Sequence, residues 1–147
     1  MKIQIKKFHQ LSLDELYEIL KLRVDVFVVE QECAYPELDD LDQKADHVYV
    51  LSEDEIISYL RIYYPEPNKA AIGRVVTKAK SRGKGLSRKM MEAAMDFIEK
   101  NNSIDKMYLQ AQEHLTKFYA SFGFKEKSES YLEDGIPHVD MERDNVQ

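Results

Sequence analysis

The segment Arg82-Gly83-Lys84-Gly85-Leu86-Ser87 constrains the fold more than any other part of this 147-residue chain. It follows a β-rich run at residues 70–77 and precedes a helical pattern that begins at Leu86, so two glycines stand where a strand passes into a helix. Glycine permits backbone conformations closed to other residues and a close approach of a ligand. The first turn of a helix adds unpaired N–H groups and the positive end of its dipole. This segment, called the glycine loop below, therefore indicates a phosphate or pyrophosphate site.

The glycine loop matches neither of the common nucleotide fingerprints. The Walker A spacing is absent, and the dinucleotide fingerprint fails because its third glycine position holds Arg88. Six bases and no acid lie between residues 78 and 89, and they would attract an anion: Lys78, Lys80, Arg82, Lys84, Arg88 and Lys89. A Gly-x-Gly pair on its own is more often a structural turn, so the interpretation depends on the rest of the chain.

Hydrophobic periodicity predicts alternating strands and helices around that loop. Ser12 followed by Glu15 predicts a capping box at the start of the first helix. The predicted elements are a strand at Ile3 and Ile5, a helix with an apolar stripe at Leu13, Leu16, Leu20, Val24 and Phe27, strands at 47–51, 56–64 and 70–77, a helix at 86–100 with Leu86, Met90, Ala94 and Phe97 on one stripe, a strand at 107–111, a short helix at 115–122, and two final strands, the last at Val139 and Met141. This order predicts one α/β domain over residues 1–147 with a mixed sheet.

Composition limits the classes of protein to which the chain can belong. Its length is that of one domain, and its net charge of -6 opposes a general nucleic-acid binder. The single cysteine, Cys33, excludes an internal disulfide framework and a cysteine-based zinc cluster. No apolar run approaches ~18 residues and the start lacks a secretory signal, so we expect a cytoplasmic protein without a membrane span. The oligomeric state stays open, a homodimer included.

Several segments together resemble the GNAT acetyltransferase superfamily. The strand at 72–77, the glycine loop and the following helix are similar to its motif A, with the signature Q/R-x-x-G-x-G/A. Arg82 to Leu86 fit the first five places, and Ser87 stands where Gly or Ala is usual. Residues 118–124 resemble the later motif, a short helix that ends in Gly-Phe. The strings at 26–31, 111–115 and 131–138 resemble the ElaA-like branch, so the resemblance covers nearly the whole chain.

This resemblance implies a GNAT-like fold, a mixed and mostly antiparallel twisted sheet flanked by helices. It also implies transfer of acetyl from acetyl-CoA to a primary amine by direct attack in a ternary complex, without a metal. The pyrophosphate would lie on the glycine loop, and the pantetheine amides would pair with the strand before it. The expected acetyl-CoA-binding residues are Val75, Val76, Thr77, Arg82, Gly83, Lys84, Gly85, Leu86, Ser87 and, where many members have Asn, Gln112.

The resemblance assigns one catalytic group and leaves another open. Tyr119 falls where members of the superfamily carry the acid that protonates the departing CoA thiolate. The base is open, because Arg74 occupies the strand where many relatives use Glu. The candidates are Glu30, Asp46, His47, His114 and His138. We favour His114 and Glu30, which lie in the ElaA-like strings.

The acidic stretch at residues 25–46 bears on the acceptor. It holds eight acids and one base, Lys44, and in GNAT proteins this region lines the acceptor side. An acidic rim would attract a cation, so we expect a small cationic amine as the second substrate, and no nucleic acid. Two other classes stay open: a non-catalytic acyl-CoA-binding or regulatory module, and a nucleic-acid binder that uses the bases at 78–89.

Overall fold

Strands rich in buried apolar residues form the sheet of this chain, whose computed structural model describes residues 2–145. The strand order is β1-β2-β3-β4-β5-β8-β6, with β7 paired to β8, and every pairing except β4–β5 is antiparallel. The strands of the described chain are β1 (Ile3–Lys7), β2 (Asp46–Ser52), β3 (Glu55–Glu66), β4 (Lys69–Thr77), β5 (Lys106–Gln112), β6 (Lys125–Glu126), β7 (Tyr131–Glu133) and β8 (Ile136–Asp144). The predicted mixed, mostly antiparallel α/β sheet is confirmed, with three final strands where the sequence indicates two.

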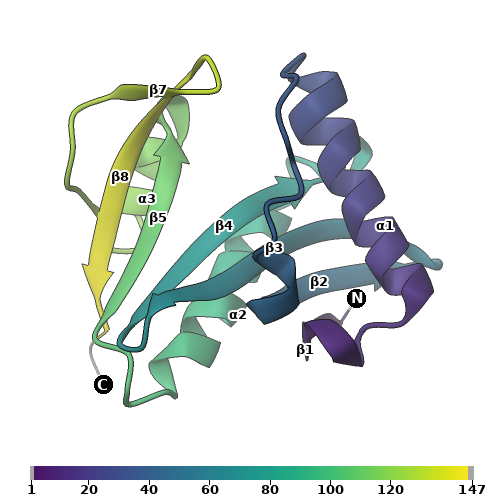
Figure 1. Cartoon of the computed structure of the whole chain (residues 1–147), viewed down its shortest axis with the longest axis horizontal. Coiled ribbons are helices and arrows are strands. Elements are labelled where there is room, and N and C mark those ends of the chain that lie inside the picture. Colours follow the sequence, from purple (N-terminus) through teal and green to yellow (C-terminus); the bar gives the residue numbers. More distant parts are fainter. Residues whose placement is uncertain (1, 146–147) are drawn as a thin grey trace.

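Helices cover both faces of this sheet, with α1 (Leu13–Arg23) in front of it and α2 (Leu86–Glu99) behind it in Figure 1. The predicted capping box begins α1: the N–H of Glu15 donates to Oγ of Ser12 at 3.0 Å, and the N–H of Ser12 donates to Oε1 of Glu15 at 2.8 Å. After Arg23 the chain continues as a π-helical segment, η2 (Val24–Glu30). The remaining helical elements are α3 (Thr116–Ala120) and the single 3₁₀ turns η1 (Phe8–Gln10), η3 (Asp42–Lys44), η4 (Ala79–Ser81) and η5 (Glu113–Leu115). No helix within residues 2–145 is long and apolar enough to cross a membrane.

The core has two parts, one on each face of the sheet. Because neighbouring side chains of a strand point to opposite faces, Tyr59 packs with Ile19 of α1, while Leu60 packs with Met90 of α2. The part under α2 is the larger one and is fully apolar at its centre, where Met90, Met91 and Ala94 have no exposed surface.

The predicted helical stripes need correction. Leu13 is 87% exposed, and the buried residues of α1 and η2 are Ile19, Leu22, Arg23 and Val26. Apolar residues occur around most of this helix, so their spacing alone does not identify the buried face, which is the one that packs against Tyr49, Tyr59 and Val76 of the sheet. In α2 the predicted Leu86, Met90 and Ala94 are buried, but Phe97 is 37% exposed, and Met91, Met95 and Ile98 complete the buried face instead.

Strands β4 and β5 pair at one end and then separate, and this opening positions the site. Their parallel register runs only from Lys69 opposite Lys106 to Ala71 opposite Tyr108. In Figure 1, β5 and β8 lean away from β4 beyond that point. On its other side β4 carries an irregularity against β3, because Tyr59 pairs with Val76 but Arg61 pairs with Gly73, which leaves one extra residue in β4. Arg74 in this bulge has a left-handed backbone, with φ of 53°.

Candidate active site

The glycine loop joins the end of β4 to the start of α2 with two residues in the left-handed conformation. The φ angles are 79° at Gly83 and 75° at Gly85, which is the N-cap of α2. A Cβ built on either glycine would meet nothing within 4 Å, so the backbone conformation selects glycine here and the space beside it stays open. Within residues 2–145, the N–H groups of Gly83, Lys84 and Gly85 donate no recorded hydrogen bond. The loop therefore offers free donors at a helix N-terminus.

Some of the bases around the glycine loop are already paired with acids. Lys78 and Lys80 both contact the carboxylate of Glu55. Arg82 binds Glu30 through both terminal nitrogens, at 2.7 and 3.0 Å, and its Nε donates to the carbonyl of Thr77 at 2.9 Å. This guanidinium lowers the pKa of Glu30. Among the described residues, Lys84, Arg88 and Lys89 have no recorded acidic partner, so they supply the positive charge at the loop that no acid neutralises.

Ser87 is the second residue of α2 and links that helix to the sheet. Its Oγ lies 2.9 Å from Oγ1 of Thr77, which in turn lies 3.0 Å from Oγ of Ser58 on β3. The neighbouring Leu86 is buried in the core under α2. These side chains therefore serve packing, and what they offer a ligand is the backbone of the first helical turn. The hydroxyl chain explains why Ser fits where Gly or Ala is usual.

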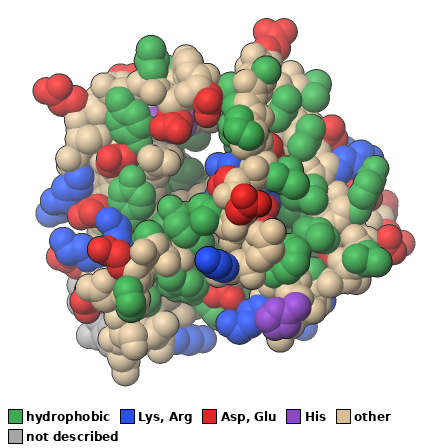
Figure 2. All heavy atoms as spheres, viewed as in Figure 1, with side chains coloured by type: hydrophobic (Ala, Val, Ile, Leu, Met, Phe, Trp, Pro, Cys, Tyr) green, Lys and Arg blue, Asp and Glu red, His purple; other side chains and the backbone are tan. Residues whose placement is uncertain are grey.

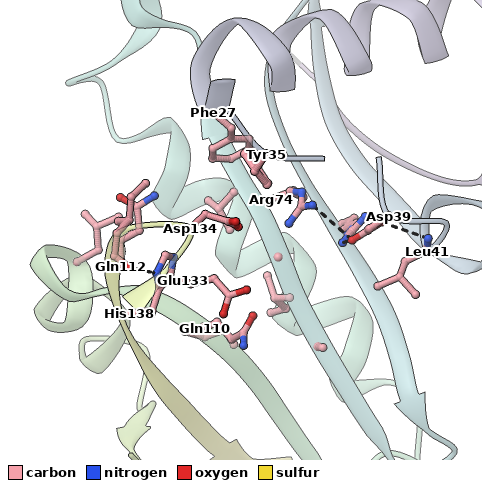
Figure 3. A pocket seen from close by; sticks show the side chains of 18 of the residues that line it. Phe27, Tyr35, Asp39, Leu41, Arg74, Gln110, Gln112, Glu133, Asp134 and His138 are labelled. Carbon is pink, nitrogen blue, oxygen red and sulfur yellow. Dashed lines mark hydrogen bonds and ion pairs between the residues drawn. The ribbon is translucent and has the colours of Figure 1, made fainter. Parts of the chain in front are cut away.

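A cavity of about 540 Å³ opens where β4 and β5 part. Figure 3 shows side chains from both walls directed into it, with Arg74 on one side and Gln110, Gln112 and His138 on the other. Its lining residues are Phe27, Gln31, Cys33, Tyr35, Pro36, Asp39, Leu41, Arg61, Tyr63, Ala71, Ile72, Gly73, Arg74, Val75, Tyr108, Leu109, Gln110, Gln112, Leu115, Tyr119, Glu133, Asp134, Ile136 and His138. Of the three β4 residues predicted to bind pantetheine, Val75 lines the cavity, whereas the side chains of Val76 and Thr77 are buried outside it.

Tyr119 of α3 reaches this cavity from the core. Its side chain is buried, with 6% of the residue exposed, and its ring meets the ring of Phe118 edge-on at 5.1 Å between centroids. Burial raises the pKa of Tyr119 to about 12. With this pKa, the phenol is protonated at neutral pH. No hydrogen bond of its hydroxyl is recorded within the described chain, so the hydroxyl is free to donate into the cavity.

The five candidate bases are not brought together. His138 lines the cavity, but Glu30 and His114 do not: Glu30 is bound to Arg82, and His114 is exposed on η5. His47 is wholly buried, with Nδ1 2.6 Å from the hydroxyl of Tyr59 and Nε2 2.9 Å from the carbonyl of Asp42. Asp46 is also buried outside the cavity and accepts from the hydroxyl of Tyr64 at 2.7 Å. Within residues 2–145, no group of three or more His, Cys, Asp or Glu side chains is placed to hold a metal ion.

Three arginines and three acids alternate in a closed arrangement beside the cavity, called the arginine–carboxylate ring below: Arg23, Glu37, Arg74, Asp39, Arg61 and Asp42. Oε2 of Glu37 accepts from Nε of both Arg23 and Arg74 at 2.7 Å. Oδ1 of Asp42 accepts from Arg23 at 2.8 Å and from Arg61 at 2.9 Å, and Asp39 binds Arg61 and, at 3.4 Å, Arg74. Figure 3 shows Arg74 and Asp39 at the cavity wall.

The ring overturns the expectation of a free acidic rim at residues 25–46. Glu37 and Asp42 are buried and ion-paired, and Asp39 is bound as well. Burial alone would raise the pKa of Asp39, but the hydrogen bonds and charge of Arg61 outweigh it and bring that pKa to about 2. Asp25, Glu32 and Asp40 are exposed but do not line the cavity. The arginines lie outside the stretch in sequence, so its local charge does not reveal the neutralisation.

Two other carboxylates do line the cavity, and the sequence analysis missed them. Glu133 ends β7, and Asp134 and Gly135 form a two-residue hairpin turn with φ angles of 50° and 79°. Neither Glu133 nor Asp134 has a recorded ion pair within the described chain, and the thiol of Cys33 holds the carbonyl of Asp134 at 3.3 Å. The Asp-Gly dipeptide is a strong hairpin signal that could have located this turn from the sequence.

Comparison with known proteins decides the family. A family model described as "Acetyltransferase (GNAT) domain" matches residues 15–144. The chain belongs to the GNAT acetyltransferase family. This GNAT chain is 42% identical over 138 residues to a UPF0039 protein from Schizosaccharomyces pombe, with 92% of each chain covered. Both the resemblance to GNAT proteins and the predicted fold are thereby confirmed.

Two solved structures are similar to the GNAT chain over nearly its whole length, and one of them is ElaA. The crystal structure of an acyl-CoA N-acyltransferase from Pseudomonas aeruginosa matches with a TM-score of 0.91 and 40% identity, covering 97% of this chain and 98% of that one. The crystal structure of ElaA from Escherichia coli matches with a TM-score of 0.91 and 36% identity, covering 97% and 99%. The ElaA-like resemblance of the three short strings is therefore confirmed.

Proposed function

We propose that this GNAT chain transfers the acetyl group of acetyl-CoA to the nitrogen of a small, cationic primary amine, by direct attack in a ternary complex. The observation that carries the proposal is the cavity between β4 and β5, which holds the buried phenol of Tyr119 on one wall and lies on the strand that leads into the glycine loop. A single strand, β4, thus leads from the cavity that Tyr119 lines toward the glycine loop. The Pseudomonas relative is described as an acyl-CoA N-acyltransferase, which agrees with this reading. Because acetyl-CoA is an intracellular substrate, we place the reaction in the cytoplasm.

The residues of the glycine loop fit the phosphates of acetyl-CoA. Gly83 and Gly85 leave open space beside their Cα atoms, and the neighbouring N–H groups have no recorded partner in residues 2–145. Lys84 would add charge, and Arg82 would contribute through the part of its guanidinium that Glu30 leaves exposed. The edge of β4 beyond Ala71 is not paired with β5, so its backbone is available to the pantetheine amides. Gln112 lines the facing wall and would contact the same arm.

The thioester supplies an activated acetyl group, and the chain supplies orientation and proton transfer. We assign Tyr119 the role of the acid that protonates the leaving sulfur, since its hydroxyl lies in a buried environment and holds its proton at neutral pH. The backbone N–H groups of the β4 bulge at Arg74 and Val75 are candidates for polarising the thioester carbonyl.

The charge of the cavity supports a cationic acceptor, although not through the acids first expected. The arginine–carboxylate ring has three positive and three negative members, so it adds no net charge. Glu133 and Asp134 then leave the cavity negative, which would attract an ammonium group. A nucleic acid would be repelled there, and three of the six bases near the glycine loop are already engaged by acids.

The experiment is a turnover screen with acetyl-CoA against amines of graded charge: monoamines, diamines, polyamines, aminoglycosides and lysine peptides. Free thiol is measured together with the acetylated amine, and acetyl-CoA binding is measured separately by calorimetry. We expect thiol release only when an amine is present, in equal amount with product, and faster for cationic amines. Binding without turnover of any amine would assign the chain to the non-catalytic acyl-CoA-binding class instead, and absence of binding would overturn the proposal.

A further inference from the structure

His138 is the one imidazole that lines the cavity among the described residues, and it stands on a regular strand. It lies on β8 opposite Gln112 of β5, at the last pair of their seven-residue antiparallel ladder, and it also pairs with Tyr131 of β7 on the other side. Figure 3 places it beside Gln112 and close to Glu133 on the wall that faces Arg74. Side chains on strands are held more precisely than those on loops, whereas His114 occupies an exposed 3₁₀ turn outside the cavity.

The tautomer of His138 follows from its hydrogen bond. Its Nδ1 lies 2.7 Å from the carbonyl oxygen of Ile136, and because a carbonyl only accepts, Nδ1 carries the hydrogen. In the neutral ring Nε2 then carries the lone pair, and no partner of Nε2 is recorded among residues 2–145. The ring is also fixed in orientation, since it stacks on Tyr131 at 6.3 Å between centroids and 27° between planes. His138 is therefore held with a proton acceptor free to act.

Carboxylates and phenols lie on the elements packed around His138. The titratable and charged groups on the neighbouring elements are Tyr131, Glu133 and Asp134 of the β7 hairpin, Tyr108 of β5, Tyr119 of α3 and Asp140 of β8 itself. Across the cavity, Arg61 and Arg74 are balanced by the acids of the ring, and Asp39, whose pKa is about 2, is too weak a base to compete.

We propose that His138 is the general base for the acceptor amine, an inference that rests on the proposed acetyl transfer. Nε2 of His138 first takes one proton from the acceptor ammonium. The freed amine nitrogen bonds to the carbonyl carbon of the thioester, and the carbon–sulfur bond breaks with its electron pair leaving on sulfur. The sulfur receives a proton from the hydroxyl of Tyr119, and a second N–H proton passes through water to the tyrosinate. His138 then releases its proton to water, so that the products are an amide, a free thiol and one proton.

The test compares His138→Asn with His114→Asn, using the best amine from the turnover screen. Asparagine at 138 retains an N–H donor near the position of Nδ1 but has no basic nitrogen. We expect kcat/KM for the amine to fall roughly 100-fold or more at pH 7, and the loss to shrink as pH rises, because the free amine and hydroxide then replace the missing base. Acetyl-CoA affinity stays unchanged, and His114→Asn behaves as wild type. His138→Gln is the second variant should His138→Asn fail to fold.

The outcomes distinguish the role of His138 as the base from the occurrence of acetyl transfer. A loss that shrinks with rising pH supports His138 as the base. A loss by the same factor at every pH, or a rate within twofold of wild type, overturns that role and leaves the acetyltransferase proposal standing. Absence of wild-type turnover with every amine overturns both. A series of acceptors with falling amine pKa adds a second readout, because the variant's defect should shrink along it.

Discussion

Arg23 and Glu37 form an ion pair from which water is excluded: Nε of Arg23 donates to Oε2 of Glu37 at 2.7 Å, and neither side chain has more than 2% of its surface exposed. The same carboxylate oxygen receives Arg74 of β4. Glu37 thereby ties the loop after η2 both to the helix α1 and to the strand that frames the cavity. A buried charge of this kind is tolerated only while its partners are present.

Arg23→Met should be strongly destabilising. The substitution removes the positive charge and leaves Glu37 and Asp42 buried with fewer partners, a change that costs about 3–5 kcal/mol in comparable cases. We expect that loss in the free energy of unfolding measured by urea denaturation at pH 7. Lys21→Met, on the exposed face of the same helix, is the matched control and should change stability by less than about 0.5 kcal/mol. Equal effects of the two substitutions would show that the ring does not stabilise the fold.

His47 should make stability fall as the solution becomes acidic. Burial lowers the pKa of His47 below its ordinary value and outweighs the carbonyl of Asp42, which raises it. Below about pH 6.5 the unfolded chain therefore binds a proton that the folded chain does not, and stability present above that pH is lost, at up to about 1.4 kcal/mol per pH unit. Urea denaturation at pH 7.5, 6.5 and 5.5 measures the slope. His47→Gln should reduce it, while His9→Gln, at an exposed position, should retain it.

The charge of residues 25–46 could not be predicted from the local sequence. Eight acids against one base predict an acidic surface, and the composition of the stretch is as stated. Three of its carboxylates are nonetheless neutralised by Arg23, Arg61 and Arg74, which lie 14 to 37 residues away from the carboxylates they bind. Only the packing of α1, β3 and β4 against one another brings these partners together, and no spacing rule within the stretch contains that information.

Tyr119→Phe should separate chemistry from binding. Without the phenol proton the leaving sulfur lacks its acid, so we expect kcat to fall by about 10²-fold or more while the Kd for acetyl-CoA is unchanged. Because burial raises the pKa of Tyr119 to about 12, wild-type activity should show no loss from ionisation of this group up to pH 10. Tyr108→Phe removes another cavity phenol, one bound to Asp140 at 3.1 Å, and serves as the control. Full turnover by Tyr119→Phe would remove Tyr119 from the mechanism.

Two substitutions at Gly85 distinguish backbone conformation from ligand access. Gly85→Ala forces an L-residue to a φ of 75° and should destabilise the chain by about 1 kcal/mol, whereas Gly85→Asn adopts that conformation more readily. Both place a side chain in the open space beside the helix N-terminus. If acetyl-CoA phosphates occupy that space, both variants should weaken its binding roughly tenfold in a calorimetric titration. Binding of Gly85→Asn equal to wild type would place the phosphates elsewhere.

The double substitution Glu133→Gln and Asp134→Asn should raise KM for a cationic amine. It removes the two cavity carboxylates for which the described chain records no ion pair, and the expected increase is roughly tenfold, with acetyl-CoA affinity unchanged. Asp40→Asn changes charge at an exposed site outside the cavity and should leave KM as it is. Steady-state kinetics at two salt concentrations measures the effect, which should weaken as salt rises. An unchanged KM in the double variant would exclude the hairpin from acceptor recognition.

Local signals predicted most of the fold because they report local geometry. The Ser12–Glu15 capping box, the glycines of the loop and the buried Leu86, Met90 and Ala94 of α2 each depend on residues within one or two turns. The site is predicted less completely. Tyr119 and Gln112 were found by motif and line the cavity, but nothing local distinguishes His138 from His114: that difference arises from which residue of the β5–β8 ladder faces the opening.

The arginine–carboxylate ring also bears on how this scaffold can change its substrate. Tyr35, Asp39 and Leu41 line the cavity from a loop that lacks regular secondary structure, and the ring, rather than a backbone ladder, anchors that loop. The ring holds this loop at Glu37 and Asp39, and the neighbouring positions of the loop are not members of the ring. We therefore expect residues 34, 36 and 38 to tolerate substitution while Arg23, Glu37 and Asp42 keep the loop in place. Tyr35 is tied to the ring, because its hydroxyl donates to Glu37 and Arg74 lies over its aromatic ring. One side of the cavity can thus be remodelled without substitutions in β4, the glycine loop or Tyr119, to which the proposed function assigns the acetyl donor.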